Sequence, residues 1–118
     1  MADAESAINS RIGSGLQEWV RRMGHHDAGS SIHDVAEELG VTSQQLAWYF
    51  KNVHGTSFTQ WRKQLRIEDA RILMSTRPEL SISQIGRMVG IPDRSNFGKR
   101  FKDVMGCMPS EYRRTISN

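Results

Sequence analysis

Two stretches of the chain repeat one another, SIHDVAEELGVTSQQLAWYFKNVHGTSFTQWRK (residues 31–63) and SISQIGRMVGIPDRSNFGKRFKDVMGCMPSEYRR (residues 81–114). The first half of each copy aligns at an offset of fifty residues, and the second half aligns at fifty-one because the later copy carries one extra residue. The matched pairs are Ile32/Ile82, Val35/Ile85, Ala36/Gly86, Leu39/Val89, Gly40/Gly90, Val41/Ile91, Leu46/Phe97, Phe50/Phe101, Lys51/Lys102, Val53/Val104, Gly55/Gly106 and Trp61/Tyr112. Because glycines and aromatic residues recur together, the repeat indicates two copies of one structural unit.

The first copy carries the signals of a helix, a turn and a second helix. Ser31 is a helix cap in front of apolar residues at helical spacing, which are Ile32, Val35, Ala36 and Leu39. Gly40 supplies the positive φ that ends this helix. Thr42 and Gln45 then predict a capping box for the next helix.

The second copy repeats these signals, with a cap at Ser81 and Gln84, a stop at Gly90 and a restart around Pro92-Asp93. A short glycine turn between two helices is typical of the helix-turn-helix motif. One such pair is also compatible with a structural helical hairpin. Two pairs, each followed by a basic helix, favour DNA binding.

Three further helices complete an all-α fold of two tandem helix-turn-helix subdomains joined by a long linker helix. Apolar spacing predicts an N-terminal helix over about residues 5–23. The linker helix runs over residues 58–74 and ends near Arg77-Pro78, and the last helix opens at Pro109. We therefore divide the chain into an N-terminal helix and loop (1–30), the first motif (31–57), the linker helix (58–76) and the second motif with the C-terminal helix (77–118).

Composition limits the class of protein. The chain has 118 residues, of which 37% are hydrophobic and 25% charged, as expected of one compact domain or two small ones. No apolar stretch is long enough to span a membrane, so we expect no membrane contact from this segment. The single cysteine, Cys107, excludes an internal disulfide and fits a cytoplasmic protein.

Basic residues are concentrated near the C-terminus. From Arg94 to Asn118 there are six basic residues and two acidic ones, in a chain with a net charge of +3. This local excess favours a polyanionic partner. Solvated basic surface is the alternative when charge is considered alone.

Helical periodicity separates a buried side from an open side on each predicted recognition helix, the second helix of each motif. In the first, the core side is expected to hold Leu46, Tyr49, Phe50 and Val53, and the open side Gln44, Ala47, Trp48 and Lys51. In the second, the core side is expected to hold Phe97, Phe101 and Val104. Its open side has Ser95, Lys99 and Lys102, flanked by Asn96 and Gly98, with Arg94 at the N-terminal tip.

The residue types on the open sides suit major-groove readout. Gln44 is suited to adenine, whereas Arg94 and Lys99 are suited to guanine. Ala47 is limited to a thymine methyl group, and Gly98 allows close approach of the backbone. Polar helix-capping surface is the alternative for Gln44, Ser95 and Asn96.

Trp48 is expected to be exposed, which is unfavourable unless DNA or a neighbouring helix covers it; we favour DNA. The first motif is otherwise poor in positive charge. Its phosphate contacts are expected to depend on Arg62 and Lys63 at the start of the linker helix. Lys51, and Lys102 in the second motif, are also predicted to contact the DNA backbone. We therefore expect the second motif to supply more of the electrostatic affinity and the first to depend more on shape and apolar contact.

The arrangement resembles the DNA-binding domain of the AraC/XylS family of bacterial transcription regulators. The residues that carry the resemblance are LRIEDARILM (residues 65–74) and the second copy of the repeat (residues 81–114), and the match covers about residues 31–114. The resemblance implies about seven helices in two lobes, with both recognition helices in successive major-groove segments of an asymmetric site. By the same resemblance, base contacts come from Gln44, Ala47, Trp48, Arg94, Ser95, Asn96, Gly98 and Lys99. Lys63 and Arg113 match positions that hold phosphates, whereas Ala47 and Gly98 depart from the polar residues usual in the family.

Family members normally attach this domain to a ligand-binding or sensor domain. The resemblance therefore implies such a domain in a larger regulator, with a stand-alone member as the alternative, and RNA polymerase as a second partner. No cofactor is expected.

Other classes of function are less well supported by the sequence. The possible metal ligands His25, His26, His33, His54 and Cys107 lack a recognised spacing, so no metal site is expected. Cys107 has no histidine in the second motif to activate it, and no phosphate-binding glycine loop is present, so no enzyme is expected. The main alternative to DNA binding is a helical protein-interaction module whose surface includes Trp48 and Tyr49.

Overall fold

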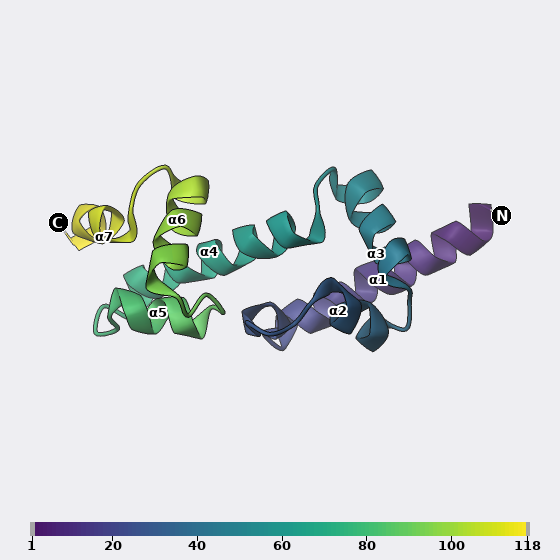
Figure 1. The fold of residues 1–118 in the computed structure, drawn as a ribbon, viewed down its shortest axis with the longest axis horizontal. Helices are drawn as coiled ribbons and strands as arrows, with labels where there is room; N and C mark the ends of the chain where they lie inside the picture. The colour runs from purple at the N-terminus through teal and green to yellow at the C-terminus, as the bar shows by residue number, and fades with distance from the viewer. Residues whose placement is uncertain (1, 118) are drawn as a thin grey trace. The chain divides into compact units, whose positions relative to one another are not determined.

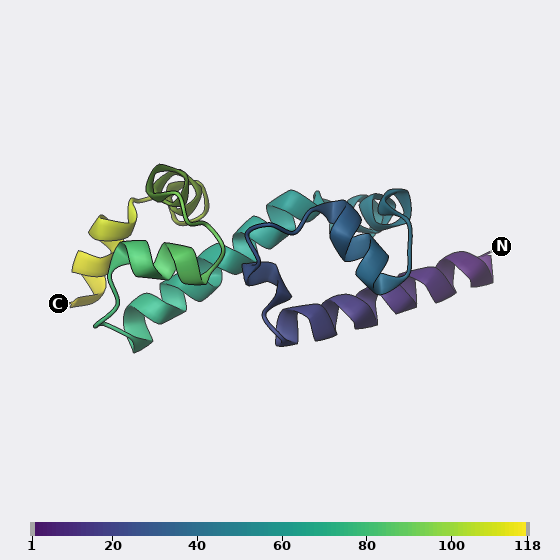
Figure 2. The same cartoon turned by 60° about the horizontal axis from the view of Figure 1, so that its bottom comes forward.

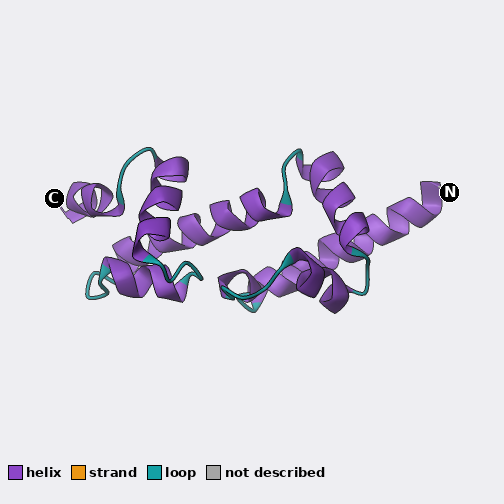
Figure 3. Ribbon diagram, viewed as in Figure 1, coloured by secondary structure: helices purple, strands orange, loops and turns teal. Residues whose placement is uncertain are grey.

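The computed structural model describes residues 2–117, and every regular element within them is a helix (Figures 1 and 3). In chain order the elements are α1 (Ala2–Arg21), the 3-10 turn η1 (Gly24–His26), α2 (Ile32–Leu39), α3 (Ser43–Tyr49), the π-helical turn η2 (Phe50–His54), α4 (Phe58–Thr76), α5 (Ile82–Met88), α6 (Arg94–Met105) and α7 (Pro109–Ser117). The predicted all-α class with seven helices is confirmed. None of the described helices combines the length and the apolar character that a membrane crossing needs.

The chain forms two compact units. The first unit comprises Met1–Gly24 and Gly29–Trp61, and the second comprises His25–Ala28 and Arg62–Asn118. The first turn of α4 therefore belongs to the first unit and the rest of α4 to the second. Each unit contains one helix-turn-helix pair, α2–α3 in the first and α5–α6 in the second.

Local hydrogen bonds start and stop the helices as the sequence predicts. Thr42 Oγ1 accepts from the Gln45 amide at 3.0 Å, and Gln45 Oε1 accepts from the Thr42 amide at 2.9 Å. The same reciprocal box joins Ser81 and Gln84. Gly40 ends α2 with a φ of 74°, a left-handed conformation that glycine adopts without a Cβ penalty.

The core of the first unit is aromatic. Trp19 of α1, Phe50 of η2 and Phe58 of α4 are almost fully buried, and the Trp19 and Phe58 ring centroids lie 5.9 Å apart. Leu46 and Tyr49 of α3 belong to the same buried cluster. The predicted core side of the first recognition helix is therefore confirmed for Leu46, Tyr49 and Phe50.

The prediction that Val53 is buried is wrong, since its side chain is 52% exposed. The reason is the π-helical turn η2, which has more residues per turn than the α-helix on which the periodicity argument depends. The His54 ring, from the same turn, stacks on the buried Phe50 with a centroid distance of 5.5 Å, although His54 itself is exposed.

The second unit packs α5, α6 and α7 around the C-terminal part of α4 (Figure 2). Ile67, Ala70 and Met74 supply the α4 side of this core, and Phe97 and Phe101 supply the α6 side. Val104 and Tyr112 pack against it while partly buried. The predicted buried side of α6 is confirmed.

Side chains of α4 hold the η1 segment in the second unit. The buried Arg66 donates from Nε to the His25 carbonyl at 2.6 Å and from Nη2 to the Asp27 carbonyl at 2.9 Å. Burial lowers the pKa of Arg66 to about 10, so its guanidinium is charged at neutral pH. Asp69 Oδ2 also meets Nε2 of His25 at 2.6 Å and Nε2 of His26 at 2.7 Å.

Because His25 is buried, the fold is expected to be sensitive to acid. Burial lowers the pKa of His25 below its usual value of 6.5, and the hydrogen bond to Asp69 offsets only part of this effect. The unfolded chain therefore binds a proton more readily than the folded chain. The stabilisation is present above the unfolded pKa and is lost as the pH falls through the folded pKa.

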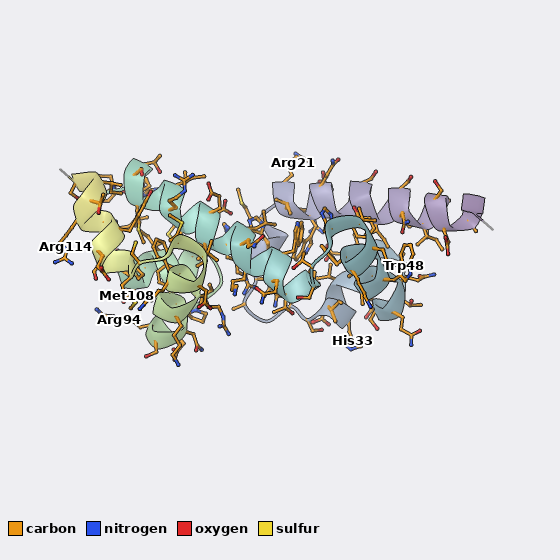
Figure 4. All side chains as sticks on the ribbon, turned by 90° about the horizontal axis from the view of Figure 1, so that it is seen from above. Arg21, His33, Trp48, Arg94, Met108 and Arg114 are labelled. Carbon is orange, nitrogen blue, oxygen red and sulfur yellow. The ribbon has the colours of Figure 1, made fainter. Side chains whose placement is uncertain are left out.

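We predict that the free energy of unfolding falls as the pH drops from about 7 towards 5, measured by urea unfolding across that range. His25→Asn should flatten the dependence, whereas His33→Asn should leave it unchanged because His33 is exposed in the first unit (Figure 4). Equal pH slopes in the wild type and His25→Asn would contradict this assignment.

Candidate nucleic-acid interface

The helix α3 has one side in the core and one side open. Leu46 and Tyr49 are buried, whereas Gln44, Ala47 and Trp48 are exposed, as is Lys51 in the turn that follows. The Thr42 cap starts the helix directly before these residues, so its N-terminal turn is well defined. This arrangement agrees with the predicted open side.

Trp48 is 46% exposed, although it is a large aromatic residue (Figure 4). It lines a hollow of about 510 Å³, together with Gln44 of α3 and with Ile8 and Asn9 of α1. The helix α1 therefore borders the indole without covering it. An open apolar ring beside a glutamine amide is suited to contacts with bases and sugars.

The burial of Tyr49 weakens the alternative prediction of a protein-interaction module. It requires Tyr49 beside Trp48 on the surface, but only 8% of Tyr49 is exposed. The Tyr49 ring packs edge-on against Phe50 with a centroid distance of 5.5 Å. Tyr49 therefore belongs to the core of the first unit and not to a partner surface.

The helix α6 exposes a basic and polar surface. Asp93 caps it by accepting from the backbone N–H of Asn96 at 2.8 Å, and Asn96 is exposed. The other exposed residues of the predicted set are Arg94, Ser95, Lys99 and Lys102. Arg100, which was not among the predicted contacts, is also exposed and adds to the positive charge.

The expectation that Gly98 lies on the open side is wrong, since Gly98 is buried. The covering group comes from outside the helix. A Cβ placed on Gly98 would lie 3.0 Å from the terminal methyl carbon Cε of Met108. Backbone approach at Gly98 would therefore require Met108 to move.

The predicted phosphate contacts differ in how accessible they are. Lys51 and Lys102 are exposed, whereas Arg62, Lys63 and Arg113 are partly buried. Lys63 Nζ lies 3.6 Å from Asp103 Oδ2, so its charge is partly balanced within the second unit. Burial lowers the pKa of Arg62, and Asp27 opposes that shift. Sequence reasoning missed these contacts because each partner lies about 35 to 40 residues away along the chain.

Within the described residues, one group of side chains brings potential metal ligands together, namely His25, His26 and Asp69. Sequence reasoning had not paired the two histidines with Asp69, which lies more than forty residues further along the chain. The separations of 2.6 and 2.7 Å are those of hydrogen bonds, with each imidazole N–H donating to the same carboxylate oxygen. The group joins the η1 segment to α4.

The sequence pattern of a family described as a helix-turn-helix domain matches residues 35–115, which include both recognition helices. The chain belongs to the AraC/XylS family. It is therefore a DNA-binding domain of the kind that regulates transcription.

A relative in this AraC/XylS family is the arabinose operon regulatory protein of Escherichia coli strain K12. It is 34% identical over 113 residues, which are 91% of this chain and 38% of the relative. The chain thus spans about two fifths of the length of the curated relatives it matches.

Solved structures share the fold. The C-terminal domain of AraT, a response regulator from Geobacillus stearothermophilus, superposes with a TM-score of 0.79 at 30% identity and covers 89% of this chain and 84% of that domain. The DNA-binding domain of the global transcriptional factor AdpA, solved in complex with a target DNA, has a TM-score of 0.78 at 16% identity. That alignment covers 88% of this chain and 90% of the AdpA domain, and it supports the fold alone.

The Lys63–Asp103 pair gives a testable prediction for an AraC/XylS domain. Asp103→Asn removes the carboxylate and releases Lys63 for a DNA phosphate, so DNA should bind more tightly. The log–log salt slope should steepen by up to about 0.9, as for one added phosphate contact. Glu79→Gln is the matched control, because Glu79 is equally exposed but pairs with Arg77. Equal effects of the two variants in fluorescence anisotropy would show that only net charge matters.

Proposed function

We propose that the chain binds an asymmetric double-stranded DNA site by inserting α3 and α6 into successive major-groove segments. The observation that carries this proposal is the same in each unit: the second helix of the pair has its apolar side in the core and its polar side exposed. The major groove admits one α-helix, and residues near the helix N-terminus contact base edges. Because both helices belong to one chain, the site needs no symmetry.

Each exposed side chain has a role that follows from its chemistry. Gln44 pairs with adenine, and Arg94 and Lys99 pair with guanine. Ala47 and Trp48 make apolar contacts, whereas Ser95 and Asn96 donate to or accept from base edges. Lys51 and Lys102 neutralise phosphates, with further phosphate contacts from Arg62, Lys63 and Arg113.

The comparisons support DNA binding as the role of the domain and point to a longer protein. The AdpA domain was solved with a target DNA, and the arabinose regulator is much longer than this chain. We infer that the domain works within a larger regulator that carries a sensor or ligand-binding domain and contacts RNA polymerase. Such a protein acts in the cytoplasm, where bacterial DNA lies, and its role is recognition of DNA, with no catalytic step of its own.

Selection from a random-sequence duplex pool tests the proposal directly. We expect one enriched asymmetric sequence. Its affinity should fall steeply with salt, with a log–log slope of about −0.9 for each phosphate contact. An interaction module without DNA binding would enrich no sequence.

Loss of a base-contacting cation should weaken binding to the enriched duplex. For Arg94→Ala and Lys99→Ala we expect affinity to fall roughly tenfold to a hundredfold, since a bidentate contact contributes about 1–3 kcal/mol. Arg77→Ala is the control, because it removes the same charge from the loop between α4 and α5, where Arg77 Nε pairs with Glu79 at 2.5 Å. Unchanged affinity in both α6 variants, with the helical circular dichroism intact, would refute the contact assignment for α6.

Trp48→Ala tests the first unit. We expect affinity to fall at least severalfold with a weaker change in salt slope, because the indole contributes apolar contact and no charge. The free energy of unfolding should change little, since Trp48 is nearly half exposed. Ile72→Ala, which trims an exposed apolar residue of α4, should leave DNA affinity unaltered. A large loss of stability in Trp48→Ala would indicate a core role instead.

A further inference from the structure

The recognition helix of the second unit lacks a side chain at position 98, and Met108 fills the space. A Cβ on Gly98 would lie 3.0 Å from the Met108 methyl carbon, closer than ordinary van der Waals contact. The thioether thus occupies the position that a side chain of residue 98 would take. Arg94 and Met108 project from the same side of the second unit (Figure 4).

The backbone of Met108 is held in place at the start of α7. Its amide donates to Glu111 Oε1 at 3.3 Å, and its carbonyl accepts from the Tyr112 amide at 3.0 Å. The adjoining Pro109 is buried. With the backbone anchored on both sides, the side chain is directed onto α6.

Met108 remains 39% exposed despite its contact with Gly98. The exposed part adjoins a helix whose neighbouring exposed residues are polar or cationic, including Ser95 and Lys102. A flexible, polarizable thioether at this position adds an apolar element to an otherwise hydrophilic surface. In the major groove, the apolar group that distinguishes one base is the 5-methyl of thymine.

We propose that Met108 is a specificity-determining residue. It contacts a thymine 5-methyl group in place of the side chain that residue 98 of α6 lacks. This inference rests on the proposed function, because it requires α6 to enter the major groove. Met108 thereby supplies from the α6–α7 turn a contact that the helix itself does not make.

Uracil substitution isolates the methyl group. The duplex enriched by the wild-type chain is synthesised with uracil at each thymine in turn, and the affinity of each duplex is measured. We expect wild-type binding to weaken about fourfold at one or two thymines, which is about 0.8 kcal/mol for one buried methyl group. Met108→Ala should bind the thymine and uracil duplexes equally at those positions.

Two further variants complete the test. Met108→Leu keeps an apolar side chain and should retain the uracil sensitivity, which shows that the effect is not a loss of folding. Met88→Ala is the matched control, since Met88 is a 43% exposed methionine of α5, and it should give the wild-type pattern.

The outcomes are distinct. If no sequence is enriched, the proposed function fails and this inference fails with it. If a duplex is enriched but Met108→Ala keeps every uracil effect of the wild type, or the wild type shows none, DNA recognition stands and the role of Met108 is overturned. Thymines whose uracil effect survives in Met108→Ala are contacted by other residues, such as Ala47.

Discussion

The burial of one side of each recognition helix is the constraint on which the interface depends. Leu46 and Phe50 in the first unit, and Phe97 and Phe101 in the second, are spaced four residues apart and are almost wholly buried. Burying a side chain of this size contributes about 1.5–3 kcal/mol, so turning either helix about its axis would sacrifice several such contributions. The exposed side is therefore determined by packing before any DNA is present.

Local signals made most of the helices predictable. Capping boxes such as Thr42 with Gln45 join residues three positions apart, so their hydrogen bonds can be inferred from a short local sequence pattern. The positive φ at Gly40 has the same local origin. Periodicity failed at Val53 because it assumes an α-helix throughout, whereas the chain forms a π-turn from Phe50 to His54.

The candidate site was less predictable, because its accessibility depends on tertiary contacts. Gly98 is covered by a residue from the next turn, and Lys63 meets Asp103 forty residues away. Asp69 joins His25 and His26 across a similar distance. Helical spacing identified the open sides of α3 and α6. It does not indicate which side chains from other parts of the chain contact those sides.

These contacts also change how the charge of the chain should be interpreted. Arg66 is buried against backbone carbonyls, and Lys63 is partly balanced by Asp103, so neither contributes a fully solvated charge to the surface. Of the two recognition helices, α6 carries the exposed cations Arg94, Lys99, Arg100 and Lys102, whereas the first has only Lys51 in the turn that follows α3. This contrast is the reason to expect more of the electrostatic attraction to phosphates from α6, and a greater dependence of α3 on the shape and apolar surface around Trp48. A recognition helix with little charge, such as α3, distinguishes DNA sequences mainly by shape and apolar contact. Salt weakens these contacts far less than it weakens charge–charge attraction.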